Sequence, residues 1–192
     1  IPEQNSKAGS ANRDIANPRA RGIIEGFPGG FGWKTKFLQL STDDLIFLGN
    51  PVRSEILDVK RNVRSYSEYS KNPRILILGG SQGARSINYS MPDVVQKLSL
   101  KMDIEIMHQT GEHDYLKICE MYKENGFSAD VFPFIQDMAK AYEWADLVVG
   151  RSGAMTVSEL SAIGMPSILI PYPYAMDNHQ LFNARFLEEK KA

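Results

Sequence analysis

The chain has 192 residues, of which 43% are hydrophobic and 23% charged, and its formal net charge is −1. This composition is ordinary for a globular protein, and the near-zero charge excludes the basic field by which nucleic-acid-binding proteins hold phosphates. The single cysteine, Cys119, excludes an internal disulfide and favours a reducing compartment. Apolar runs reach only about five residues, against the roughly 20 that a transmembrane helix needs.

From residue 73 onward, short apolar runs alternate with helical patterns. Strands are predicted at 74–78, 103–107, 129–132, 147–149 and 167–170. Helices are predicted from about residue 85 to 98, with Ile87, Met91, Val94 and Leu98 on one face, and at 112–125, 136–144, 154–163 and 177–190. Pro92 predicts a kink or a restart in the first helix, and Asp177 is a predicted N-cap of the last.

Strands that are apolar on both faces and alternate with helices indicate a parallel sheet covered on both sides. We therefore predict an α/β fold with a doubly wound domain over 73–192. Ligands of such sheets bind at the carboxyl ends of the strands. That rule selects the loops 79–84, 108–112, 133–137, 150–155 and 171–180.

Residues 1–72 read differently, because they hold too little apolar sequence for a core of their own. Strands are predicted at 22–24 and 45–48, and the polar stretch 54–72 resembles a linker. We predict that 1–50 is the remnant of an N-terminal domain and 51–72 an interdomain linker. The chain opens without Met and closes inside a predicted helix, so both ends are expected to be cut.

The loop Gly79-Gly-Ser-Gln-Gly-Ala84 joins a predicted strand to a predicted helix. Glycines admit a ligand close to the backbone, and the helix N-terminus attracts an anion such as phosphate. A tight turn without ligand is an equally open interpretation. The glycine spacing fits neither the Walker A loop nor the dinucleotide fingerprint, and Met107-His108-Gln109 supplies no acid for a ribose. No nicotinamide cofactor is therefore expected.

Two further loops carry candidate polar groups. Glu159, in the first turns of the helix after Arg151-Ser-Gly153, can accept two hydrogen bonds from a ribose diol, although the pattern alone favours a solvated helix glutamate. Residues 177–180, Asp-Asn-His-Gln, suit sugar hydroxyls or simple helix capping. No metal-ligand spacing and no Asp-x-Asp motif occurs, and Cys119 fits a small core residue better than a nucleophile.

Five motifs occur together in order: Pro2-Glu-Gln-Asn5, Gly49-Asn-Pro-Val-Arg53, Gly79–Ala84, Arg151–Glu159, and Asp177–Gln180 with Asn183-Ala184. In order and spacing they resemble the MurG family of N-acetylglucosaminyltransferases, which convert lipid I to lipid II in peptidoglycan synthesis. The resemblance covers nearly the whole chain. It implies a GT-B fold of two Rossmann-like domains, with UDP-GlcNAc as the donor and held by the C-terminal domain.

The resemblance also implies roles for individual residues. Glu159 matches the ribose-binding glutamate, Ile135 the residue whose backbone reads the uracil edge, and Asn5 a residue on the acceptor side. His179 stands where many relatives carry glutamine, which leaves its sugar contact open. The positions implied near the diphosphate are Arg53, Gly80, Ser81, Gln82 and Gly83, and those implied at the GlcNAc are Ala154, Met155, Thr156 and Gln180.

The same resemblance implies that the catalytic histidine and the membrane-docking patch precede Ile1, so that these 192 residues bind donor without turnover. It implies lipid I as acceptor and a cytoplasmic, peripheral location on the inner face of the bacterial cell membrane, with no metal or cofactor. A non-catalytic nucleotide-sugar-binding module and another GT-B enzyme, such as a UDP-GlcNAc 2-epimerase, are the alternatives.

Overall fold

A computed structural model describes residues 2–3, 23–25, 45–60, 72–79, 84–175 and 178–189, with side chains from residue 48 onward. The chain divides into two compact units. Unit 1 comprises Ile1–Arg53, Ser152–Ala162 and Pro171–Ala192, and unit 2 comprises Ser54–Arg151 and Ile163–Ile170. Among the described helices, none is both long and apolar enough to cross a membrane.

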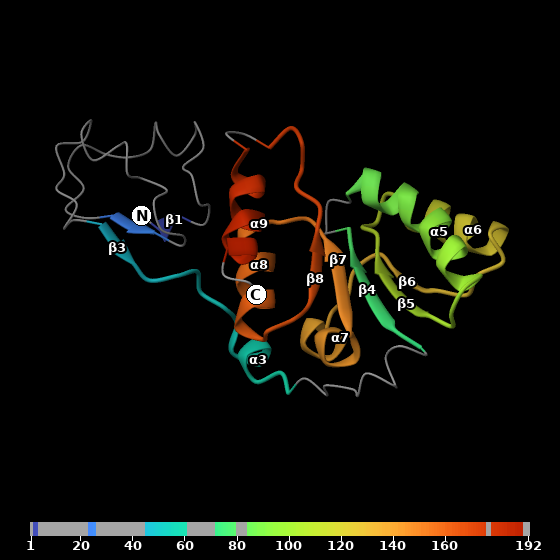
Figure 1. Ribbon diagram of the computed structural model, residues 1–192, viewed down its shortest axis with the longest axis horizontal. Coiled ribbons are helices and arrows are strands. Elements are labelled where there is room, and N and C mark those ends of the chain that lie inside the picture. The colour runs from blue at the N-terminus through green and yellow to red at the C-terminus, as the bar shows by residue number, and fades with distance from the viewer. Residues whose placement is uncertain are drawn as a thin grey trace. The chain divides into compact units, whose positions relative to one another are not determined.

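Unit 2 is built on a five-stranded parallel sheet (Figure 1). Its order is β6-β5-β4-β7-β8, so the chain starts in the centre, winds to one edge, and then returns to build the other half. The bounds are Arg74–Leu78 for β4, Glu105–Gln109 for β5, Asp130–Phe132 for β6, Leu147–Gly150 for β7 and Ser167–Leu169 for β8. This order confirms the predicted doubly wound α/β fold.

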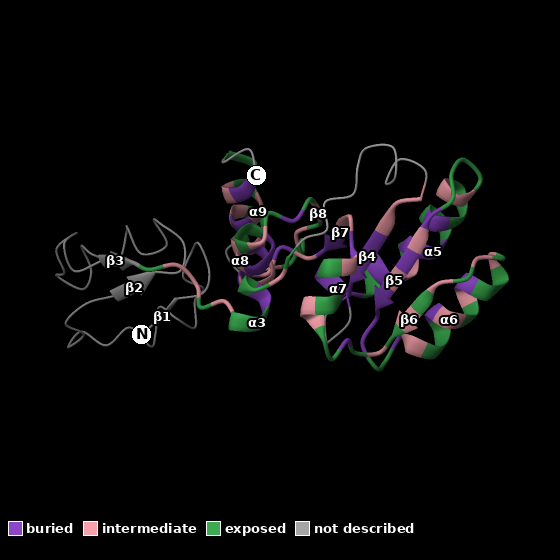
Figure 2. Ribbon diagram, turned by 90° about the horizontal axis from the view of Figure 1, so that it is seen from below, coloured by how far each residue is buried: buried purple, intermediate pink, exposed green. Residues whose placement is uncertain are grey.

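Helices cover both faces of this sheet. Ile75 and Ile77 of β4 pack with residues of α5, Arg85–Ser99, and α6, Tyr115–Glu124. Because side chains alternate along a strand, Leu76 faces the opposite side, where α7, Met138–Trp144, contacts β4. Figure 2 shows the buried residues concentrated along β4 and on the inner sides of the helices.

The helical face of α5 differs from its prediction by one residue. Ile87 and Met91 are buried as expected, but Val94 is 42% exposed and Val95 is fully buried. Leu98 packs partly buried against the same cluster as Ile87 and Met91, so the prediction failed at Val94 alone. Pro92 lies inside α5 without interrupting it, so the predicted restart is wrong.

Other element boundaries shift by one to three residues. β5 begins two residues later than predicted, and α6 begins three residues later. Gly126 follows α6 with a φ of 70°, the left-handed conformation in which glycine commonly ends a helix. The stretch read as a linker contains the short helix α3, Ser54–Leu57, whose fully buried Ile56 belongs to an element that contacts α7.

In unit 1, a parallel sheet has the order β1-β2-β3, formed by Pro2–Glu3, Ile23–Glu25 and Leu45–Phe47. Two of these strands were predicted, and β1 was not. The helices α8, Ala154–Ala162, and α9, His179–Glu189, pack side by side (Figure 1). The predicted cap Asp177 lies outside the described residues.

Candidate functional site

The loops at the carboxyl edge of the unit 2 sheet are joined by backbone hydrogen bonds. Gly79 N–H donates to the Gln109 carbonyl at 2.7 Å, Thr110 N–H to the Phe132 carbonyl at 2.9 Å, and Ile170 N–H to the Gly150 carbonyl at 2.8 Å. The chain reverses its winding between β4 and β7, so this edge contains the topological switch point where such sheets bind ligands.

Gly79 is required by the protein's own packing. A Cβ there would overlap Oδ1 of Asn88 and lie 2.7 Å from the Gln109 carbonyl oxygen. The predicted anion-binding residues Gly80, Ser81, Gln82 and Gly83 lie outside the described residues. The helix that follows them starts at Arg85, and its N-cap, Ala84, supplies no side-chain hydrogen bond to the first turn. This helix start therefore retains backbone donors suited to an anion.

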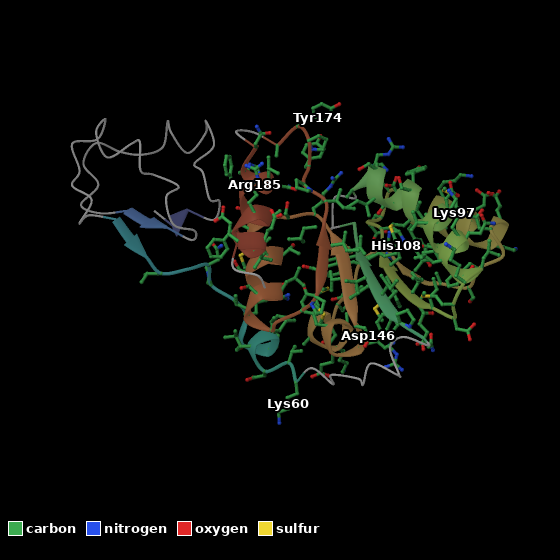
Figure 3. The ribbon with its side chains drawn as sticks, in the orientation of Figure 1. Lys60, Lys97, His108, Asp146, Tyr174 and Arg185 are labelled. Atoms are coloured by element: carbon green, nitrogen blue, oxygen red, sulfur yellow. The ribbon has the colours of Figure 1, made fainter. Side chains whose placement is uncertain are left out.

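Beneath Gly79 lies a buried polar network centred on Asn88 and His108 (Figure 3 labels His108). The Asn88 Nδ2 donates to the Thr110 carbonyl and to Asp114 Oδ2, both at 2.8 Å, so Asn88 Oδ1 is the acceptor. His108 Nε2 lies 3.2 Å from that oxygen and must carry the proton, which leaves Nδ1 to accept from Tyr122 Oη at 3.0 Å.

Burial sets the charge of this network. It lowers the pKa of His108 to about 3 and raises the pKa of the Tyr122 hydroxyl, so the imidazole is neutral and the phenol protonated at pH 7. A neutral histidine satisfied on both nitrogens fixes the ends of β5, α5 and α6 against each other. The role of His108 in this network is structural.

Arg151, for which no individual role was predicted, bridges two elements at the carboxyl edge. Its Nη1 donates to the Ile170 carbonyl at 3.1 Å and its Nη2 to Ser86 Oγ at 2.6 Å. Ser86 lies in the first turn of α5, so this arginine brings a permanent cation to the helix start that follows the glycine loop.

In unit 1, two residues from separate motifs meet. Arg53 Nη2 lies 3.1 Å from Glu159 Oε1, and the Glu159 side chain is 10% exposed. Next to this pair, Asn50 Nδ2 donates to Ser158 Oγ at 2.9 Å. The interpretation of Glu159 as a solvated helix glutamate is therefore wrong, because α8 carries it on its buried side.

The loop that precedes α8 and the loop that precedes α9 are also joined by hydrogen bonds in unit 1. Ser152 Oγ donates to the Gln180 carbonyl at 2.7 Å, and the buried Asn183 donates from Nδ2 to the Ser152 carbonyl at 3.0 Å. The Gln180 side chain is oriented by Oε1, which accepts from Tyr172 N–H at 2.9 Å. The predicted GlcNAc contacts Ala154–Thr156 form the first turn of α8, and His179 is the first residue of α9.

Ile135 lies in the loop between β6 and α7 and is 8% exposed. Its N–H donates to Gln109 Oε1 at 2.9 Å, a contact that the sequence did not predict. Asn5 lies outside the described residues. Within the described ranges, no three His, Cys, Asp or Glu side chains gather as a metal site would require.

A family model decides the class of this chain. Residues 74–192 match the glycosyltransferase family 28 C-terminal domain. The chain belongs to glycosyltransferase family 28. The matched range covers the whole of the five-stranded sheet together with α8 and α9, so the family's C-terminal domain contains most of the candidate residues described above.

Individual proteins similar to this chain give a more specific comparison than the family model does. A Coxiella burnetii protein named UDP-N-acetylglucosamine–N-acetylmuramyl-(pentapeptide) pyrophosphoryl-undecaprenol N-acetylglucosamine transferase is 45% identical over 192 residues, 100% of this chain and 51% of its own length. A Pseudomonas entomophila protein of the same name is 42% identical over 193 residues, covering 100% of this chain and 50% of the relative. The chain thus spans about half the length of these relatives.

A solved structure of MurG from Acinetobacter baumannii has a TM-score of 0.75 and 33% identity, and the match covers 99% of this chain and 50% of that one. The resemblance to MurG and the GT-B class predicted from the motifs are confirmed by these matches.

Proposed function

We propose that this chain supplies the donor-binding part of a transferase that moves GlcNAc from UDP-GlcNAc to lipid I. The observation that carries the proposal is the pairing of Arg53 with Glu159 at 3.1 Å. In a nucleoside diphosphate the ribose and the first phosphate are neighbours. A carboxylate that binds the ribose diol and a guanidinium that binds the diphosphate must therefore also be neighbours.

The glycosyl transfer itself requires that the departing diphosphate be stabilised. The uncapped start of α5 and the Arg151 guanidinium beside its first turn are donors suited to that charge. These groups are preorganised by contacts within the protein, so they need little rearrangement when charge develops on the leaving group. Relatives named for this transfer match the chain along its whole length, which supports the same reaction here.

We further propose that the protein works at the inner face of the cytoplasmic membrane, because an undecaprenol-linked acceptor is confined to the bilayer. The names of the relatives give this acceptor chemistry. Transfer is tested by incubating the intact gene product with UDP-GlcNAc and lipid I and following lipid II. Donor binding without any turnover would favour the non-catalytic binding module, and epimerisation of the free nucleotide sugar would favour the 2-epimerase.

The donor site is tested by calorimetric titration of the chain with UDP-GlcNAc, with NAD and TDP-glucose as comparison ligands. We expect selective binding of UDP-GlcNAc. Glu159→Ala is expected to weaken it by about 10- to 100-fold, because a charged acceptor of two ribose hydroxyls is lost.

Glu188→Ala removes an exposed carboxylate from α9 and is the matched control, expected to bind as the unaltered chain does. Equal affinity of the Glu159→Ala and Glu188→Ala variants would contradict the assignment of Glu159 to the ribose.

A further inference from the structure

Two tyrosines lie next to Gln180, one of the predicted GlcNAc contacts. Tyr172 and Tyr174 belong to the segment that follows β8, and Tyr172 N–H donates to Gln180 Oε1 at 2.9 Å. The tyrosines and Gln180 all belong to unit 1, together with the first turn of α8. The tyrosine pair is therefore continuous with the candidate site for the donor sugar.

The two rings pack against each other and stay open to solvent. Their centroids lie 5.8 Å apart at an interplanar angle of 73°, which is an edge-to-face arrangement. Tyr174 is 83% exposed and Tyr172 is 45% exposed, and Figure 3 shows the Tyr174 side chain pointing outward from this loop. Because an edge-to-face contact covers at most one face of each ring, Tyr174 retains a flat face that its partner does not cover.

The backbone of this segment is fixed by a tight turn. The Tyr172 carbonyl accepts from Ala175 N–H at 3.1 Å, the bond that closes a β-turn over residues 172–175. Pro173 occupies the second position of this turn, where its fixed φ is favourable. The turn therefore forms without help from the Tyr174 ring, which buries too little area to stabilise the fold and is held ready for a ligand.

We propose that Tyr174 binds the acceptor, whose N-acetylmuramyl sugar stacks on the exposed ring; the proposal rests on the proposed function. The transfer joins two sugars, so the acceptor hydroxyl must come within about 3–3.5 Å of the GlcNAc anomeric carbon. The acceptor sugar therefore lies beside the GlcNAc contacts, where Tyr174 is placed by the bond from Tyr172 to Gln180. A pyranose ring presents a face of C–H groups, and this apolar face packs flat on an aromatic ring.

The neighbourhood of Tyr174 favours a sugar over the undecaprenol chain that the names of the relatives also include. An isoprenoid chain needs a continuous apolar surface. Around Tyr174, the described residues Pro173, Ala175 and Asn178 provide only short or polar side chains. A phenol, which is apolar on its faces and polar at its hydroxyl, matches a sugar with an apolar face and a rim of hydroxyl groups.

The test measures transfer by the intact gene product while the concentrations of lipid I and UDP-GlcNAc are varied separately. Tyr174→Ala is expected to raise the KM for lipid I about tenfold and to leave the KM for UDP-GlcNAc within about twofold. Tyr174→Phe keeps the ring face and should retain the KM for lipid I. Leu100→Ala is the matched control, because Leu100 follows α5 and is also 83% exposed.

An analogue of lipid I with a shortened isoprenoid chain separates the sugar from the lipid. If the ring binds the sugar, Tyr174→Ala raises the KM for the analogue as much as the KM for lipid I. An effect confined to the long-chain acceptor would overturn the proposal in favour of a contact with the isoprenoid or the membrane surface. An unchanged KM for lipid I in Tyr174→Ala, or a rise in the KM for UDP-GlcNAc alone, would also overturn it.

If the unaltered protein forms no lipid II, the proposed function fails, and the acceptor contact fails with it. Normal transfer with an unchanged KM for lipid I in Tyr174→Ala leaves the proposed function standing and removes only the role of Tyr174.

Discussion

Gly79→Ala is expected to destabilise unit 2 by about 2–4 kcal/mol, because the added methyl group meets atoms that cannot move aside cheaply. Its Cβ would overlap Asn88 Oδ1 and lie 2.7 Å from the Gln109 backbone carbonyl. Asn88 is fully buried and held by bonds to Thr110, Asp114 and His108. Urea unfolding at pH 8, followed by circular dichroism, measures the effect as a lower midpoint.

Gly153→Ala is the matched control, because the nearest atom to a Cβ there is Thr156 Oγ1 at 3.9 Å. It is expected to stay within about 0.5 kcal/mol of the unaltered chain. The double variant Gly79→Ala, Asn88→Ala should cost less than the sum of its single changes, since removing Asn88 opens space for the methyl group. A Gly79→Ala variant that unfolds at the same urea concentration as the Gly153→Ala variant would contradict this expectation. It would show that the Asn88 side chain moves aside without a loss of stability.

The sheet was predictable because its strands are short apolar runs bounded by turn residues. Arg74–Leu78 was predicted without error, since every residue from Ile75 onward is buried whichever face it occupies. The face of α5 was harder to predict. Val94 and Val95 are adjacent and equally apolar, and only the direction of α5 across the sheet decides which is buried.

The candidate site was predictable only where residue type alone suggested chemistry. Glu159 was named from its motif, but its burial depends on Arg53, 106 positions earlier, which no local pattern contains. Gln109 carries no signal in its own neighbourhood, because its side chain accepts a hydrogen bond from Ile135, 26 residues later. Gly79 was interpreted as leaving space for a ligand, whereas Asn88 Oδ1 occupies the space that a side chain at position 79 would need. Such contacts follow from topology, which the sequence pattern fixes only coarsely.

The stability of the chain is expected to fall below pH 6.5 because of His108. Burial lowers the pKa of the folded imidazole to about 3, whereas the unfolded histidine has a pKa near 6.5. Between these values the unfolded state binds a proton that the folded state does not. The contribution of His108 is therefore fully present above pH 6.5 and is lost at roughly 1.4 kcal/mol per pH unit as the pH falls toward 3.

His108→Gln removes this titration while keeping an amide that can donate and accept. At pH 8 the variant should be less stable by about 1–3 kcal/mol, because the bonds to Asn88 and Tyr122 are disturbed. Between pH 8 and pH 5, however, it should lose about 2 kcal/mol less than the unaltered chain, since its unfolded state gains no proton at this position. Urea unfolding across that range gives both differences in the free energy of unfolding.

His113→Gln, which removes an exposed histidine, controls for the loss of an imidazole as such. Parallel pH profiles for His108→Gln and the unaltered chain would mean that His108 takes up its proton in the folded state near its ordinary pKa, and the network around Asn88 would then have to accommodate an imidazolium. Divergent profiles would instead establish that the buried imidazole stays neutral in the folded state across this range.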